Sequence, residues 1–215
     1  MTTQTLPSPL HGWRLFSLLA VAVLLMSALI LLLEPNLVEA TRSAIRATAR
    51  SSFVLFLLAF TASAWAVLLP SPRVQALGQA LVRERRYIGL AFAFSHLVHA
   101  LLIYRYGQLN PQFWPGRSAL GNLPGSVGYL FILLLALTSF KGPAALLGRR
   151  AWKRLHTTGM WVLAAIFAYS NFKRIPLSAW YALPFAITGA AMALNLLGKL
   201  AQANKRRQRQ ALNTR

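Results

Sequence analysis

The chain has 215 residues, of which 56% are hydrophobic, and the hydrophobic residues fall in long stretches that exclude an ordinary soluble domain. It contains no cysteine, which excludes disulfides, thiolate metal sites and cysteine nucleophiles. The net charge of +20 comes from 23 Lys and Arg against 3 Glu, and because the basic residues flank the apolar stretches we expect them to set membrane topology and not to bind nucleic acid.

Six apolar stretches approach the roughly 20 residues that a bilayer-spanning helix needs. They are 15–33, 51–69, 87–104, 127–147, 156–172 and 179–197. The predicted fold class is therefore an all-α integral membrane protein, a six-helix transmembrane bundle in the lipid bilayer. With a cytoplasmic N-terminus, 16 of the 23 basic residues lie on the cytoplasmic side and 7 on the other, so both termini are predicted to be cytoplasmic.

These spans divide the chain into three parts. Residues 1–14 are predicted to be a cytoplasmic N-terminal segment, 15–198 the six-span transmembrane domain, and 199–215 a basic cytoplasmic tail. The tail is expected either to lie on anionic lipid or to be disordered.

The first span is predicted to end at Glu34-Pro35, because proline disfavours helical geometry in the residue before it. Arg42, Arg46 and Arg50 follow at intervals of four and share one face of the helix that leads into the second span. Two interpretations stay open. The arginines reach lipid phosphates from the helix end, or they bind an anion such as a cofactor carboxylate or phosphate.

The third span carries two histidines. Residues 73–86 alternate apolar and basic side chains, as an interfacial helix does. His96 and His99 follow at a spacing that places them on one helical face, and ionisable groups inside a membrane tend to mark function. The alternative is that His96 or His99 contacts a neighbouring helix for structural reasons alone. Turn-forming residues then predict an outer loop over 106–125.

Residues 141–143, Lys-Gly-Pro, are predicted to kink or end the fourth span. The fifth span begins at His156, two residues after Arg154, where an interfacial histidine that contacts lipid headgroups is one interpretation. All three glutamates lie outside the apolar stretches, which leaves no carboxylate for a proton relay inside the membrane.

Three sequence blocks share their order, spacing and charge placement with one family. They are Thr48-Ala49-Arg50-Ser51, Arg85-Arg86-x-x-Gly89-Leu90 with His99 thirteen residues after Arg86, and Leu137-Thr138-Ser139 followed by Leu147-Gly148, Trp152 and Leu155-His156. Across roughly residues 45–175 the chain resembles the ferric-reductase-like transmembrane domain, in its bacterial MsrQ/YedZ type, the haem-binding membrane subunit of a periplasmic methionine sulfoxide reductase system.

The resemblance implies a bacterial inner-membrane protein that carries haem b between spans 3 and 5. It also implies electron transfer from a cytoplasmic-side flavin (FMN) or quinone donor to an outer acceptor such as a periplasmic reductase subunit. His99 and His156 match two histidine positions of the family and are the expected ligands of the haem iron. His96 and Arg50 are further candidates for cofactor binding. The family's second histidine of span 5 is replaced by Tyr169, which is either an iron ligand or a packing residue whose hydroxyl pairs with His99.

The two matched histidines are predicted to lie at different depths. His99 is 13 residues past Arg86, about 20 Å along the helix, whereas His156 is two residues past Arg154, about 3 Å. The difference of about 16 Å is too large for two axial ligands of one iron. Any haem is therefore expected to depend chiefly on His99, with Tyr169 or an open position opposite. A protein of a different class, a haem-less membrane anchor, assembly partner or small transporter, is the alternative.

Overall fold

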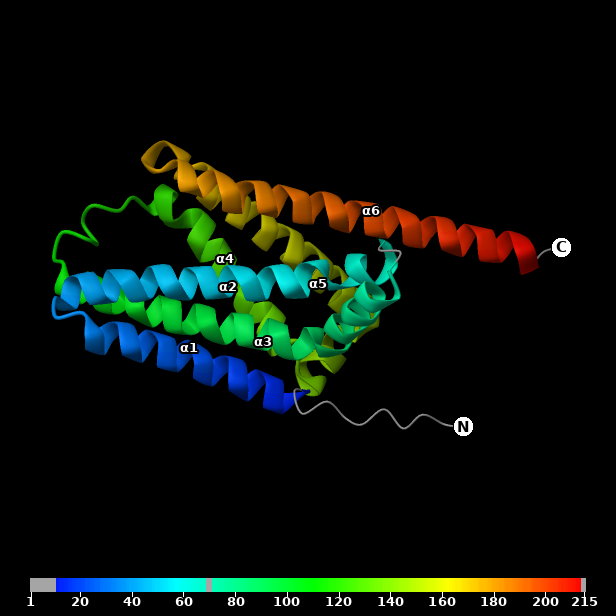
Figure 1. Ribbon diagram of the computed structural model, residues 1–215, viewed down its shortest axis with the longest axis horizontal. Coiled ribbons are helices and arrows are strands. Elements are labelled where there is room, and N and C mark those ends of the chain that lie inside the picture. Colours follow the sequence, from blue (N-terminus) through cyan, green and yellow to red (C-terminus); the bar gives the residue numbers. More distant parts are fainter. Residues whose placement is uncertain (1–10, 69–70, 214–215) are drawn as a thin grey trace. The chain divides into compact units, whose positions relative to one another are not determined.

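The computed structural model describes residues 11–68 and 71–213, and within this part of the chain it contains helices and no strand (Figure 1). The helices in chain order are α1 (Trp13–Leu33), α2 (Leu37–Leu68), α3 (Pro72–Leu109), α4 (Ala119–Leu137), α5 (Lys141–Phe172), the short 3-10 turns η1 (Ile175–Leu177) and η2 (Ala179–Tyr181), and α6 (Ala182–Asn213). The all-α class is confirmed.

Five described segments are long and apolar enough to cross a membrane. They are Trp13–Leu33, Leu37–Leu68, Pro72–Leu109, Ala119–Leu137 and Ala179–Asn204. Large apolar side chains on these helices are exposed, as in Leu25 and Leu29 of α1, which is compatible with contact with lipid. α5 is not among the five, so the crossing predicted at 156–172 stays a prediction, as does the side on which each terminus lies.

The chain divides into two compact units. One comprises Met1–Phe56 and Arg86–Ser118, and the other comprises Leu57–Arg85 and Ala119–Arg215. α2 and α3 each contribute to both units.

Aromatic contacts join the three helices of the first unit. Trp13 of α1 meets Tyr87 of α3 edge to face, with ring centroids 5.5 Å apart. Phe56 of α2 is fully buried and lies 5.7 Å from Phe92 of α3. Aromatic pairs at these separations add to the stability that their buried area provides, so α3 packs against both α1 and α2.

Small residues allow the helices of the second unit to approach closely. A Cβ atom at Gly159 of α5 would lie 3.1 Å from the side chain of Leu135 of α4. A Cβ atom at Gly198 of α6 would lie 3.0 Å from the backbone of Ala64 of α2. Glycine at such contacts brings the backbones of membrane helices together, where van der Waals packing holds them.

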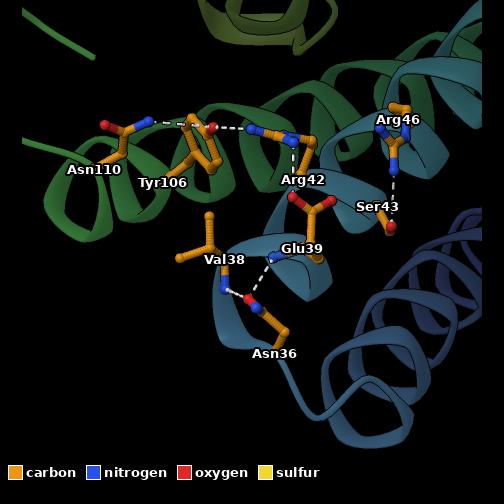
Figure 2. Close-up of polar contacts among 8 residues, drawn as sticks. All are labelled: Asn36, Val38, Glu39, Arg42, Ser43, Arg46, Tyr106 and Asn110. Carbon is orange, nitrogen blue, oxygen red and sulfur yellow. Dashed lines mark hydrogen bonds and ion pairs between the residues drawn. The ribbon is translucent and has the colours of Figure 1, made fainter. Parts of the chain in front are cut away.

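The boundary between α1 and α2 is the one predicted. α1 ends at Leu33, directly before Glu34-Pro35. Figure 2 shows how α2 begins: the side-chain oxygen of Asn36 accepts hydrogen bonds from the backbone N–H groups of Val38 (3.0 Å) and Glu39 (3.2 Å). Asparagine is a favoured residue at this position because its oxygen pairs with N–H groups that the first turn leaves unpaired.

The fourth span ends before both of its predicted limits, residues 141–143 and residue 147, because α4 ends at Leu137. The side chains of Thr138 and Ser139 turn back and donate to the carbonyl oxygens of Leu134 (2.6 Å) and Leu135 (2.7 Å). Such bonds compete with continuation of the helix. Residues 141–147 therefore open the next helix, α5, in which Pro143 falls in the first turn and needs no N–H partner.

α5 itself consists of two helical pieces joined at Gly148. This residue has φ 68° and ψ 160°, a conformation that L side chains rarely adopt. The longer second piece carries the basic stretch 149–154 and then the predicted fifth span.

Three further boundaries differ from the prediction. The segment 73–86 is not a separate interfacial helix, since α3 runs without a break from Pro72 to Leu109 and no proline interrupts it. The predicted loop over 106–125 shrinks to 110–118. The basic tail continues α6 as a helix to Asn213, so it is not disordered over this length.

Candidate functional site

His99 lies where α2 and α3 face each other in the first unit. Its Nδ1 is 3.1 Å from the carbonyl oxygen of Ile45 and 3.1 Å from Oγ1 of Thr48. A carbonyl oxygen can only accept, so Nδ1 carries the proton. The hydroxyl of Thr48 donates to the carbonyl oxygen of Ala44 at 2.8 Å, which leaves its oxygen as a second acceptor for the same N–H. Nε2 of His99 is therefore the basic nitrogen, the one suited to bind a metal.

A group of hydroxyls lies close to His99 on the same two helices. Ser52 and Ser95 are fully buried, and Ser52 donates to Ser95 at 2.8 Å. Ser51 lies 3.1 Å from Ser95, and Ser95 contacts the carbonyl oxygen of Thr48 at 3.4 Å. Small hydroxyl side chains allow two membrane helices to approach and bond to each other. Thr48 of the first sequence block thus contacts His99 of the second block, and this contact helps to fix the orientation of the imidazole ring.

His96 lies one turn before His99 and packs among aromatic rings. Its ring centroid is 4.8 Å from that of Phe92 and 5.7 Å from that of His99. The predicted common face of the two histidines is confirmed. The contact with Phe92, which itself meets Phe56, is typical of a packing role.

His156 belongs to the second unit, where the residues of the third block contact one another. Nε2 of His156 is 3.0 Å from Oγ1 of Thr138, whose hydroxyl donates to Leu134 at 2.6 Å and thus accepts from the imidazole. The rings of Trp152 and His156 are tilted by 31° with centroids 4.3 Å apart, and Nε1 of Trp152 donates to the carbonyl oxygen of Thr138 at 2.8 Å. In this arrangement Nε2 of His156 is the protonated nitrogen, which favours a role in joining α4 to α5.

Tyr169 is half exposed, at 50%, on α5 of the second unit, and Arg50 is exposed on α2 of the first. His99 and Tyr169 belong to separately described units, as do His99 and His156. Their predicted relative depths, and the roles of Arg50, Tyr169 and His156 in cofactor binding, stay predictions.

Two of the three arginines in the row, Arg42 and Arg46, have different partners (Figure 2). Arg42 donates to Glu39 and to the hydroxyl of Tyr106 of α3, both at 2.7 Å. Arg46 donates to Ser43 at 3.0 Å. The guanidinium of Arg42 is thus already neutralised by Glu39, which makes it a poor ligand for an external anion.

Sequence reasoning missed the contact between Arg42 and Tyr106. Asn110 donates to the same tyrosine hydroxyl at 3.3 Å, and the guanidinium carbon of Arg42 lies 5.6 Å from the tyrosine ring. The spacing of Glu39 and Arg42 is a signal for their ion pair. No local signal points to Tyr106, which is 64 residues away.

Among the described residues, no group of three or more His, Cys, Asp or Glu side chains could hold a bare metal ion. A haem iron, in contrast, needs one or two axial ligands from the protein. Comparison of the chain with protein-family models, with curated proteins and with solved structures finds no match.

Proposed function

We propose that the chain is a membrane electron-transfer subunit that binds haem b through His99. The observation that carries the proposal is the hydrogen bond from Nδ1 of His99 to the carbonyl oxygen of Ile45. Metal-ligating histidines generally donate their second ring N–H to a carbonyl or carboxylate, which fixes the tautomer and the ring orientation. His99 has this arrangement, and it is the histidine that both matches the resemblance and lies within the apolar stretch 87–104 of α3.

The residues around His99 fit a neutral axial ligand. Ile45 and Thr48 hold the proton on Nδ1, and the buried hydroxyls of Ser52 and Ser95 add hydrogen bonds without a charge. When bound, haem supplies one-electron chemistry through its iron. The chain's own contribution is to present Nε2, to fix the imidazole plane and to keep the ring neutral, since charging it inside a membrane is expensive.

The wider proposal covers topology and partners. We place six spans in the bacterial inner membrane with both termini in the cytoplasm, on the distribution of basic residues between the two sides. Electrons pass from a cytoplasmic-side flavin (FMN) or quinone to an acceptor on the outer side, such as a periplasmic reductase subunit. Tyr169 would supply a second ligand to the iron, or that coordination position would stay open.

The visible absorption spectrum of the full chain, purified from cells with ample haem, tests the proposal. The wild type should show a Soret band, His99→Ala should lose it, and His11→Ala should retain it because His11 is exposed and precedes α1. If the second ligand position of the iron is open or is occupied by Tyr169, the iron should be partly high-spin and should bind small exogenous ligands. Absence of a Soret band in the wild type would refute haem binding, and the membrane anchor or transporter would take its place.

A further inference from the structure

The second unit contains a small, partly open basic cavity between segments of α2, α3, α5 and α6. Its volume is about 140 Å³, and the two cationic side chains in its lining are Arg85 of α3 and Lys199 of α6. Neutral hydrogen-bonding groups accompany them, among them Thr157 and Gln202. None of the lining residues is acidic, so the lining itself offers no counter-charge.

The two cations are positioned differently. The amine of Lys199 lies 4.9 Å from the ring centroid of Trp161, a cation–π contact that holds it at the cavity wall while leaving its three N–H groups suited to an anion. Arg85 is partly buried, and the described side chain on which it acts electrostatically is His156, which supplies no negative charge. A partly buried guanidinium with no negative charge in the cavity lining favours an anionic partner.

The frame of the cavity is built from fixed contacts. Trp161 meets Phe60 of α2 edge to face, with centroids 5.4 Å apart. The buried Asn195 of α6 donates to the carbonyl oxygen of Phe60 at 2.9 Å. Gly198, next to Lys199, permits the close approach of α6 to α2. These contacts hold the segment of α6 that carries Lys199 against α2.

The size of the cavity limits its ligand. Pockets that hold a drug-sized molecule measure roughly 300–1,000 Å³, whereas one water molecule takes about 30 Å³. A cavity of 140 Å³ lies between these values and accommodates a group the size of a phosphate, with the remainder of the ligand outside.

The surroundings on α6 suit an acyl chain. Leu196, Leu197 and Leu200 flank Lys199 and are 52%, 56% and 62% exposed. A phospholipid whose phosphate enters the cavity would thus find apolar side chains beside it. Basic pockets between membrane helices bind anionic headgroups in this way.

We propose that this cavity binds a phosphate group, held by Arg85 and Lys199. The guanidinium fork matches two phosphate oxygens, and the ammonium of Lys199 supplies a second, point-like charge. The group is carried by an anionic phospholipid or is free phosphate, and the two sources are separable by experiment. This site does not depend on haem binding at His99.

Thermal unfolding of the full chain in dodecyl maltoside, a detergent without phosphate, tests the site. One series adds increasing phosphatidylglycerol to the micelles, and the other adds sodium phosphate at constant ionic strength. The wild-type midpoint should rise in at least one series. A rise with phosphatidylglycerol alone identifies the lipid headgroup, and a rise with both identifies a site for phosphate itself.

Matched variants separate the cavity from general charge attraction. Arg85→Gln and Lys199→Gln should weaken the apparent affinity about tenfold, since each removes a charge-assisted contact. Arg83→Gln on α3 and Arg207→Gln on α6 remove the same charge from exposed positions and should respond as the wild type does. Lys199→Arg should retain the response, which excludes misfolding as the cause. No rise in either series, or an equal loss in the exposed controls, would overturn the proposal.

Discussion

The Thr48 hydroxyl should contribute to haem affinity without touching the haem. Thr48→Val keeps the shape of the buried side chain and removes one of the two acceptors, each 3.1 Å from Nδ1 of His99. Loss of such a supporting bond costs 10- to 100-fold in metal affinity. Because the carbonyl oxygen of Ile45 remains, we expect the lower end of this range, about tenfold or about 1.4 kcal/mol.

The assay is transfer of haem from the purified protein to excess apomyoglobin, followed in the Soret region. Thr48→Ser retains the hydroxyl and should hold haem as the wild type does. Thr41→Val is the matched control, because Thr41 is also fully buried on α2 and donates to the fourth carbonyl before it, that of Leu37. Equal haem retention by Thr48→Val and the wild type, or an equal loss in Thr41→Val, would refute the reasoning.

Three further predictions concern topology and packing. Reporter fusions at residue 115 and at the C-terminus should report opposite sides of the membrane, and a common side would contradict the six-span topology. Gly159→Val should lower the thermal midpoint in detergent by the equivalent of about 1–3 kcal/mol, because its Cβ would lie 3.1 Å from Leu135. Gly142→Ala is the control and should leave the midpoint unchanged, because a Cβ at residue 142 meets no atom within 4 Å. Trp152→Phe keeps a ring beside His156 but removes the hydrogen bond to the carbonyl oxygen of Thr138. The free energy of unfolding should fall by about 1 kcal/mol in the same measurement, and an unchanged midpoint would argue against that bond.

The division of the chain into helices was largely predictable, because hydrophobic stretches and helix breakers act over a few residues. Glu34-Pro35 marked the end of α1 correctly. The end of α4 was misplaced because Thr138 and Ser139 continue an apolar run, and their side-chain bonds back to the preceding turn are not visible in hydropathy. The six crossings, their orientation and the haem stay predictions.

The sequence by itself determined the all-helical membrane class, the shared face of His96 and His99, and the choice of His99 as the leading candidate ligand. Tertiary structure decided which groups meet: the proton of His99 is fixed by Ile45, 54 residues away, and the charge of Arg42 is divided between Glu39 and Tyr106. Tertiary structure likewise brought Arg85 and Lys199 to one cavity. The physical reason is that helical periodicity fixes which side of a helix a residue occupies, while its partners across the interface depend on how closely small residues allow two helices to pack.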